Sequence, residues 1–122
     1  MLAGLSLLLL LPFVVYRLAK RAHSRRTWAL TGLSFGLIVS PASLGLYVLY
    51  FLHPLGFLPG MLGLMSSLIH GEPGFELATA LGLRDAHTVV NAQEGLMIDA
   101  FNGIIWGTIY GGLGRFLDFV KS

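Results

Sequence analysis

The sequence contains no cysteine and very little charge. The missing thiols exclude disulfides, thiolate metal sites and cysteine nucleophiles. Charged residues make up 11% of the 122 residues, whereas soluble domains average about 25%. With 55% hydrophobic residues and a mean hydropathy of +0.76, too few charged side chains remain to cover an apolar core. We therefore predict an all-α integral membrane protein with a single membrane domain, residues 1–122.

Motifs of catalysis and metal binding are also missing. No GxSxG elbow surrounds the serines at 66 and 67, and no HxxxH or HExxH pair or lysine-bearing phosphate loop occurs in the sequence. Ser66 and His70 form the only local serine–histidine pairing, and His53, His70 and His87 lack the spacing of metal ligands. We expect the three histidines to form interfacial hydrogen bonds. The sequence predicts no catalytic residue, metal or cofactor, and therefore no enzyme activity of this chain alone.

Three apolar stretches have the length of transmembrane helices, at residues 2–19, 28–52 and 96–117. The first reaches only about 27 Å at 1.5 Å per residue, and Pro12 should kink it. A second kink is expected at Pro41, near the middle of the second stretch.

Residues 53–70 are apolar but rich in residues that break helices, namely Pro54, Gly56, Pro59, Gly60 and Gly63. This composition predicts a short re-entrant or interfacial segment rather than a complete span. Residues 71–94 are more polar and are expected to form an outer loop. The prediction is therefore three spans plus a broken segment, with a four-span bundle as the alternative.

Five of the eight basic residues lie between positions 17 and 26: Arg17, Lys20, Arg21, Arg25 and Arg26. Such a cluster beside a span indicates a cytoplasmic loop facing anionic phospholipid. The N-terminus is then outside and the C-terminus cytoplasmic, and we expect a bacterial inner membrane location. The cluster has no interleaved aromatic residues or known motif, so no nucleic-acid binding is predicted.

Small residues recur at four-residue spacing in the last two of the three spans. The ladder of the last span comprises Gly95, Gly103, Gly107 and Gly111, and the middle span carries Gly32, Gly36 and Ser40. Small residues at this spacing let helix backbones approach closely in lipid. The two ladders either pack against each other within one chain or form a seam with another subunit.

Asp99 interrupts the glycine ladder about one turn inside the last span, and Asn102 follows on a similar face. A carboxylate in hydrocarbon is costly and needs a partner. Its position favours a structural role near the membrane boundary. A role in transport or in subunit pairing is the alternative.

These features together predict a small accessory or assembly subunit of a larger membrane complex. Its partners would be other membrane protein subunits and phospholipid, contacted through glycine-lined helix faces. The alternative is a homo-oligomeric channel or transporter with Asp99 and Asn102 in the pathway.

Overall fold

The computed structural model describes residues 7–52, 54–85 and 87–121, and no β-strand occurs in these ranges. They form the helices α1 (Leu10–Arg21), α2 (Thr27–Leu52), α3 (Phe57–Ala80) and α4 (Ala92–Lys121), with a short 3₁₀ turn η2 (Pro54–Gly56) before α3. The predicted all-helical class is confirmed for these residues.

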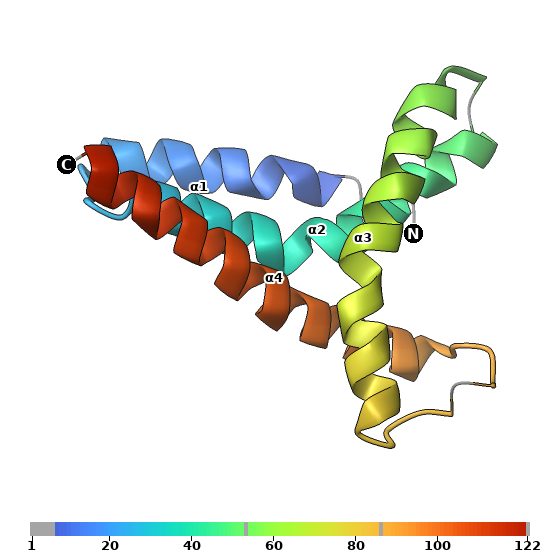
Figure 1. Ribbon diagram of the computed structural model, residues 1–122. Coiled ribbons are helices and arrows are strands. Elements are labelled where there is room, and N and C mark those ends of the chain that lie inside the picture. Colours follow the sequence, from blue (N-terminus) through green and yellow to red (C-terminus); the bar gives the residue numbers. More distant parts are fainter. Residues whose placement is uncertain (1–6, 53, 86, 122) are drawn as a thin grey trace.

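Helix α2 is the centre of the fold, because α1, α3 and α4 all pack against it. Figure 1 shows α1, α2 and α4 running side by side toward the end of the molecule that carries the C-terminus. Helix α3 crosses them steeply at the opposite end. The described parts of α1 and α4 pack on α2 from different sides, and their backbones do not approach each other closely.

Helices α2 and α4 are antiparallel and diverge where α3 meets them. At Gly63, a Cβ would lie 2.5 Å from the backbone nitrogen of Tyr47 in the second half of α2. At Gly74, it would lie 2.5 Å from the carbonyl oxygen of Ile98 in the first half of α4. Both halves of α3 therefore pack at the same end of the α2–α4 pair. This differs from the four-span bundle that the sequence leaves open.

The prediction of a broken segment at 53–70 followed by a loop is wrong in its secondary structure, because residues 57–80 form one continuous helix. Pro59 lies in the first turn of α3, where its missing N–H would have no partner within the helix. Gly60 and Gly63 are packing positions, and a Cβ at Gly60 would lie 2.5 Å from Tyr50 Cβ. The glycines that suggested helix breaks are the residues that allow α3 to pack closely against α2.

Other helix boundaries also differ from the prediction. The described part of α1 has 12 residues, and Pro12 lies in its first turn rather than at an interior kink. Residues 1–6 of the predicted 2–19 span lie outside the described part of the chain. Helix α4 is longer than the predicted 96–117 span. Asn91 caps its start: Asn91 Oδ1 accepts the N–H of Glu94 at 2.8 Å, and Asn91 Nδ2 donates to Glu94 Oε1 at 2.9 Å.

Helices α1 and α3 end in the same way. Each is followed by a residue in the left-handed conformation, His23 with φ 53° after α1 and Gly82 with φ 73° after α3. In α1, the N–H of His23 donates to Lys20 O at 3.1 Å and the N–H of Ser24 to Ala19 O at 3.0 Å. This is the Schellman pattern, and it fixes the turn that leads from α1 into α2.

Helix α2 is long and apolar enough to cross a membrane, and it is the only such helix within the described ranges. Its 26 residues correspond to about 39 Å of helix. Helix α4 has the length for crossing, with 30 residues, but its glycines and charged residues make it less apolar. The three-span arrangement stays a prediction.

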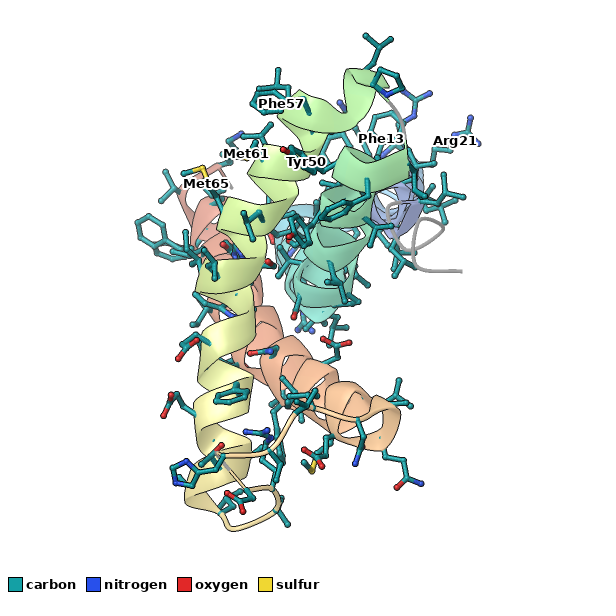
Figure 2. All side chains as sticks on the ribbon, turned by 90° about the vertical axis from the view of Figure 1, so that its right-hand side faces the viewer. Phe13, Arg21, Tyr50, Phe57, Met61 and Met65 are labelled. Carbon is teal, nitrogen blue, oxygen red and sulfur yellow. The ribbon has the colours of Figure 1, made fainter. Side chains whose placement is uncertain are left out.

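The distribution of side chains is the reverse of that in a soluble domain. The buried apolar residues are few, namely Ala19, Val39, Ala42, Ala78 and Ile98. The buried polar residues are Ser34, Ser40, Ser43, His70, Arg84, Asn102 and Asp118. Large apolar side chains instead cover the outside, and Figure 2 shows Phe57, Met61 and Met65 projecting from α3.

Candidate functional site

The two glycine ladders meet within one chain. A Cβ added at Gly32 or Gly36 of α2 would collide with the carbonyl of Tyr110 or Trp106 in α4, respectively. These are backbone atoms that no rotamer change can move. The α2 glycines are therefore what allows the two backbones to touch.

The glycines of α4 make looser contacts on the same seam. A Cβ at Gly107 would lie 3.3 Å from Leu33 Cδ1, and one at Gly111 would lie 3.4 Å from Leu33 Cβ. Gly103 faces Leu37, whose carbonyl oxygen would be 3.1 Å away. Gly95 lies outside the seam, with only Val90 nearby at 3.9 Å. Of the two packing alternatives, these contacts correspond to the intramolecular one.

Asn102 holds the backbone of α3 next to Pro73. Its side chain is completely buried. Its Oδ1 accepts the N–H of Gly74 at 2.6 Å, and its Nδ2 donates to Gly71 O at 3.0 Å. Proline removes a hydrogen bond from the helix ladder and displaces the preceding turn. Asn102 supplies polar partners to that region from the neighbouring helix.

Trp106 adds a second support one turn further along α4. Its indole Nε1 donates to the carbonyl of His70 at 2.9 Å, and the two rings meet edge to face at 4.6 Å. The side chains of Asn102 and Trp106 thus contact three backbone groups on both sides of Pro73. We call these residues, together with Ser40, Ser43, Ser66, His70, Asp99 and Tyr110, the polar junction.

A chain of hydrogen bonds crosses the polar junction from α2 to α4. Ser43 Oγ lies 2.6 Å from Ser66 Oγ, which lies 3.0 Å from His70 Nδ1. His70 Nε2 in turn lies 2.7 Å from the hydroxyl of Tyr110. His70 also lies 2.9 Å from the Ser66 carbonyl through Nδ1.

The donors in this chain can be assigned, because each hydroxyl has one proton. Ser43 donates its proton to the Val39 carbonyl, so Ser66 must donate to Ser43. The Nδ1–H of His70 is therefore the donor, and Ser66 Oγ is the acceptor. In a neutral His70, Nε2 then accepts from Tyr110. With its proton on Nδ1, His70 is not placed to activate Ser66 as a nucleophile.

Asp99 lies at the edge of the polar junction, and its side chain is half-buried. Ser40 Oγ donates to its Oδ1 at 3.1 Å. Ser40 also accepts a long contact of 3.5 Å from Asn102 Nδ2, so the two predicted polar residues share one partner. Ser40, predicted as a packing residue, is in addition a hydrogen-bonding residue.

Asp118 has a role that the sequence reasoning missed. Its carboxylate is buried and accepts the N–H groups of Trp28 and Ala29, both at 2.9 Å. It therefore caps the start of α2 from the end of α4, where the helix dipole favours a negative charge. Gly114 lies one turn earlier and is too close to the Trp28 carbonyl to carry a Cβ.

The predicted lipid-facing residues Arg17, Lys20, Arg21, Arg25 and Arg26 are all exposed. They lie at the end of α1 and the start of α2, which is also where α4 ends with Arg115 and Lys121. We call this the basic end of the molecule; Asp118 is its only acidic residue. The other acidic residues belong to the second half of α3, the loop after it and the first turns of α4: Glu72, Glu76, Asp85, Glu94 and Asp99.

Arg84 organises the loop between α3 and α4 at the acidic end. Its side chain is buried, pairs with Glu94 at 3.1 Å and donates to Thr88 O at 2.8 Å. Its guanidinium lies 4.3 Å from the ring centre of Phe75. In the described ranges, no group of three His, Cys, Asp or Glu residues is arranged to hold a metal ion. His53 lies outside those ranges.

No protein-family model, curated protein or solved structure matches this chain.

Proposed function

We propose that the chain is an integral membrane protein of the bacterial inner membrane and serves as an accessory or assembly subunit of a larger complex. The observation that carries the membrane part is the inverted side-chain distribution, with leucine and phenylalanine outside and serine, asparagine and glycine inside. Soluble monomers rarely expose apolar surface on this scale. Lipid tolerates it, because association there depends on close packing and on satisfied polar groups.

The charge distribution supports the orientation. The basic end carries almost all lysine and arginine, and the opposite end carries most of the acid. Under the positive-inside rule, the basic end is cytoplasmic. Helix α1 then runs inward, α2 outward and α4 inward, with the C-terminus in the cytoplasm and α3 on the outer side.

The role as a subunit is supported by the hydrogen bonds of the polar residues, which are made within the chain. Asn102, Trp106 and His70 bond to backbone or to each other, so the polar junction stabilises the fold. A groove on the outside of the seam, lined in part by Gly107, Gly111 and Gly112, stays open. A Cβ at Gly112 would meet nothing within 4 Å. A transmembrane helix of another subunit fits such a glycine-lined face.

Native mass spectrometry of the tagged protein, extracted gently from its own membrane, tests this proposal. We expect other polypeptides to accompany it at a fixed ratio, and Gly112→Leu to reduce that association while the chain stays folded. Leu113→Ile, a change on the same exposed stretch of α4, is the control. Release of the chain as a bare monomer from native lipid would contradict the subunit role.

A homo-oligomeric channel is the second candidate, and the half-buried carboxylate of Asp99 is the observation in its favour. In a channel, Asp99→Asn should change ion flux through reconstituted vesicles, while the chain assembles as a ring of identical copies. Unchanged flux would remove this candidate.

A further inference from the structure

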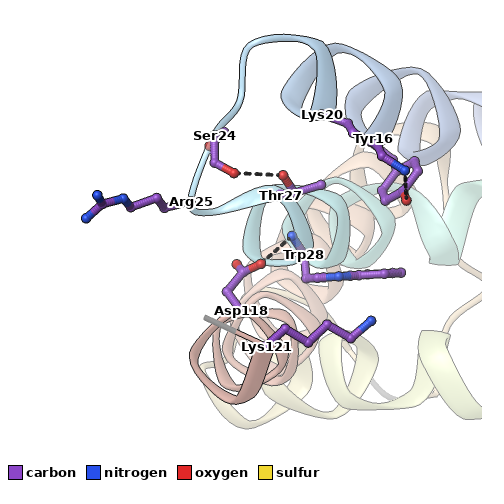
Figure 3. Close-up of a pocket in the computed structure, with 8 residues that line it drawn as sticks. All are labelled: Tyr16, Lys20, Ser24, Arg25, Thr27, Trp28, Asp118 and Lys121. Atoms are coloured by element: carbon purple, nitrogen blue, oxygen red, sulfur yellow. Dashed lines mark hydrogen bonds between the residues drawn. The ribbon is translucent and has the colours of Figure 1, made fainter.

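A pocket opens at the basic end of the molecule (Figure 3). It occupies about 590 Å³ between the last turns of α1, the start of α2 and the last turn of α4. This volume is in the range of small-molecule sites. Its lining combines cations with aromatic rings: Tyr16, Lys20, Ser24, Arg25, Thr27, Trp28, Asp118 and Lys121.

Two lysines border an aromatic pair in this pocket. The rings of Tyr16 and Trp28 lie 5.3 Å apart. Lys20 Nζ lies 5.6 Å from the Tyr16 ring centre, and Lys121 Nζ lies 4.7 Å from that of Trp28. Such contacts hold the ammonium groups near the pocket without neutralising them.

The positive charge of the pocket is not balanced from within. Asp118 is the only acid in the lining, and both its oxygens accept N–H groups from the start of α2. Over the residues that the structure covers, the only ion pair is that of Arg84 with Glu94 at the other end. Arg25 extends outward from the loop in Figure 3 and adds a third cation at the rim.

An apolar groove of about 270 Å³ begins at the same Trp28 and follows α2. It lies between α1 and α4, which both pack on α2 without a close approach of their backbones. Its lining is almost free of polar atoms: Pro12, Trp28, Thr31, Gly32, Phe35, Tyr110, Leu113, Gly114 and Leu117. The charged pocket and the apolar groove thus share Trp28 in their linings.

We propose that the pocket and groove together bind one anionic phospholipid. The phosphate lies at the pocket, near Lys20 and Lys121, and an acyl chain lies in the groove between α1 and α4. The charge of the pocket selects an anionic headgroup, and the apolar groove selects a lipid over free phosphate. This inference rests on the proposed membrane location.

The test uses the full chain reconstituted in vesicles of equal phosphatidylglycerol and phosphatidylcholine with identical acyl chains. Resistance to carbonate extraction is measured first, and its failure would contradict the membrane location rather than the lipid site. Native mass spectrometry then counts the retained lipids. We expect selective retention of phosphatidylglycerol, which Lys20→Gln/Lys121→Gln reduces about tenfold.

Arg115→Gln is the charge control, because it removes a positive charge from the same end outside the pocket and groove. It should retain phosphatidylglycerol as the wild type does. Thr31→Phe fills the groove without changing the charge and should also reduce retention. Equal loss in both charge variants, no loss with Thr31→Phe, or displacement of the lipid by soluble glycerol phosphate would each overturn the proposal.

Discussion

The amide side chain of Asn102 in α4 binds the α3 backbone on both sides of Pro73. It bonds to an N–H and a carbonyl of the α3 backbone at 2.6 and 3.0 Å, from 28 and 31 residues away in sequence. Because the site is fully buried, no solvent can take over these bonds. The proline in α3 and the asparagine in α4 therefore form one structural unit.

Asn102→Leu should destabilise the protein by about 3 kcal/mol, because it leaves two buried backbone groups without side-chain partners. The measurement is SDS titration of the protein in mild detergent, followed by circular dichroism. Ile104→Leu, an exposed change on the same helix, is the control and should have little effect. Equal stability of both variants would mean that the α3 backbone is satisfied without Asn102.

The absence of native cysteine allows a direct test of the glycine seam. A Cβ at Gly111 would lie 3.4 Å from Leu33 Cβ, close to the separation in a disulfide. Leu33→Cys/Gly111→Cys should therefore form an intramolecular crosslink on oxidation, seen as a faster monomer band on a non-reducing gel. Leu33→Cys/Gly112→Cys is the control, since a Cβ at Gly112 would meet nothing within 4 Å. Crosslinked dimers in place of the monomer would instead indicate an intermolecular seam.

His23→Gly should stabilise the protein by about 1 kcal/mol, because His23 adopts a left-handed conformation that costs a residue with a Cβ. The gain should appear as a higher midpoint in the same SDS titration. His23→Ala keeps the Cβ and should show no such gain. A stability ranking with alanine above glycine would contradict this explanation.

Asp118→Ala should lower stability by about 2 kcal/mol, since both N–H groups that its carboxylate accepts lose a charged partner. Asp118→Asn keeps one acceptor oxygen and should lie between alanine and the wild type. Glu72→Ala, at an exposed position of the other end, is the control. If asparagine and alanine were equally destabilising, the charge rather than the hydrogen bonds would account for the cap.

The sequence alone reveals features that repeat at regular spacing along a helix. The ladders of Gly32 and Gly36 and of Gly103 to Gly111 were visible because close approach needs a small residue at every turn. Their placement against each other, which the sequence left open, required the fold. The basic loop was equally visible, because the cations are adjacent in the chain.

The sequence could not predict features that depend on distant partners. Local propensity argues against a helix through Gly71, Pro73 and Gly74, yet α3 continues because α4 supplies hydrogen bonds there. Asp118 stands as a single acid among basic residues, with no pattern to show that it caps α2. The Ser66–His70 pairing was noticed, but its proton direction depends on Ser43 and Tyr110 from other helices.

The dependence of α3 on α4 has a consequence for biosynthesis. When the part of α3 around Pro73 leaves the ribosome, Asn102 and Trp106 follow about 30 residues behind and are still enclosed, so this backbone lacks the partners that it has in the finished protein. In the proposed membrane location, that segment must stay hydrated or in contact with the insertion machinery until α4 follows. The arrival of α4 thus decides when the α3 backbone around Pro73 gains its full set of polar partners.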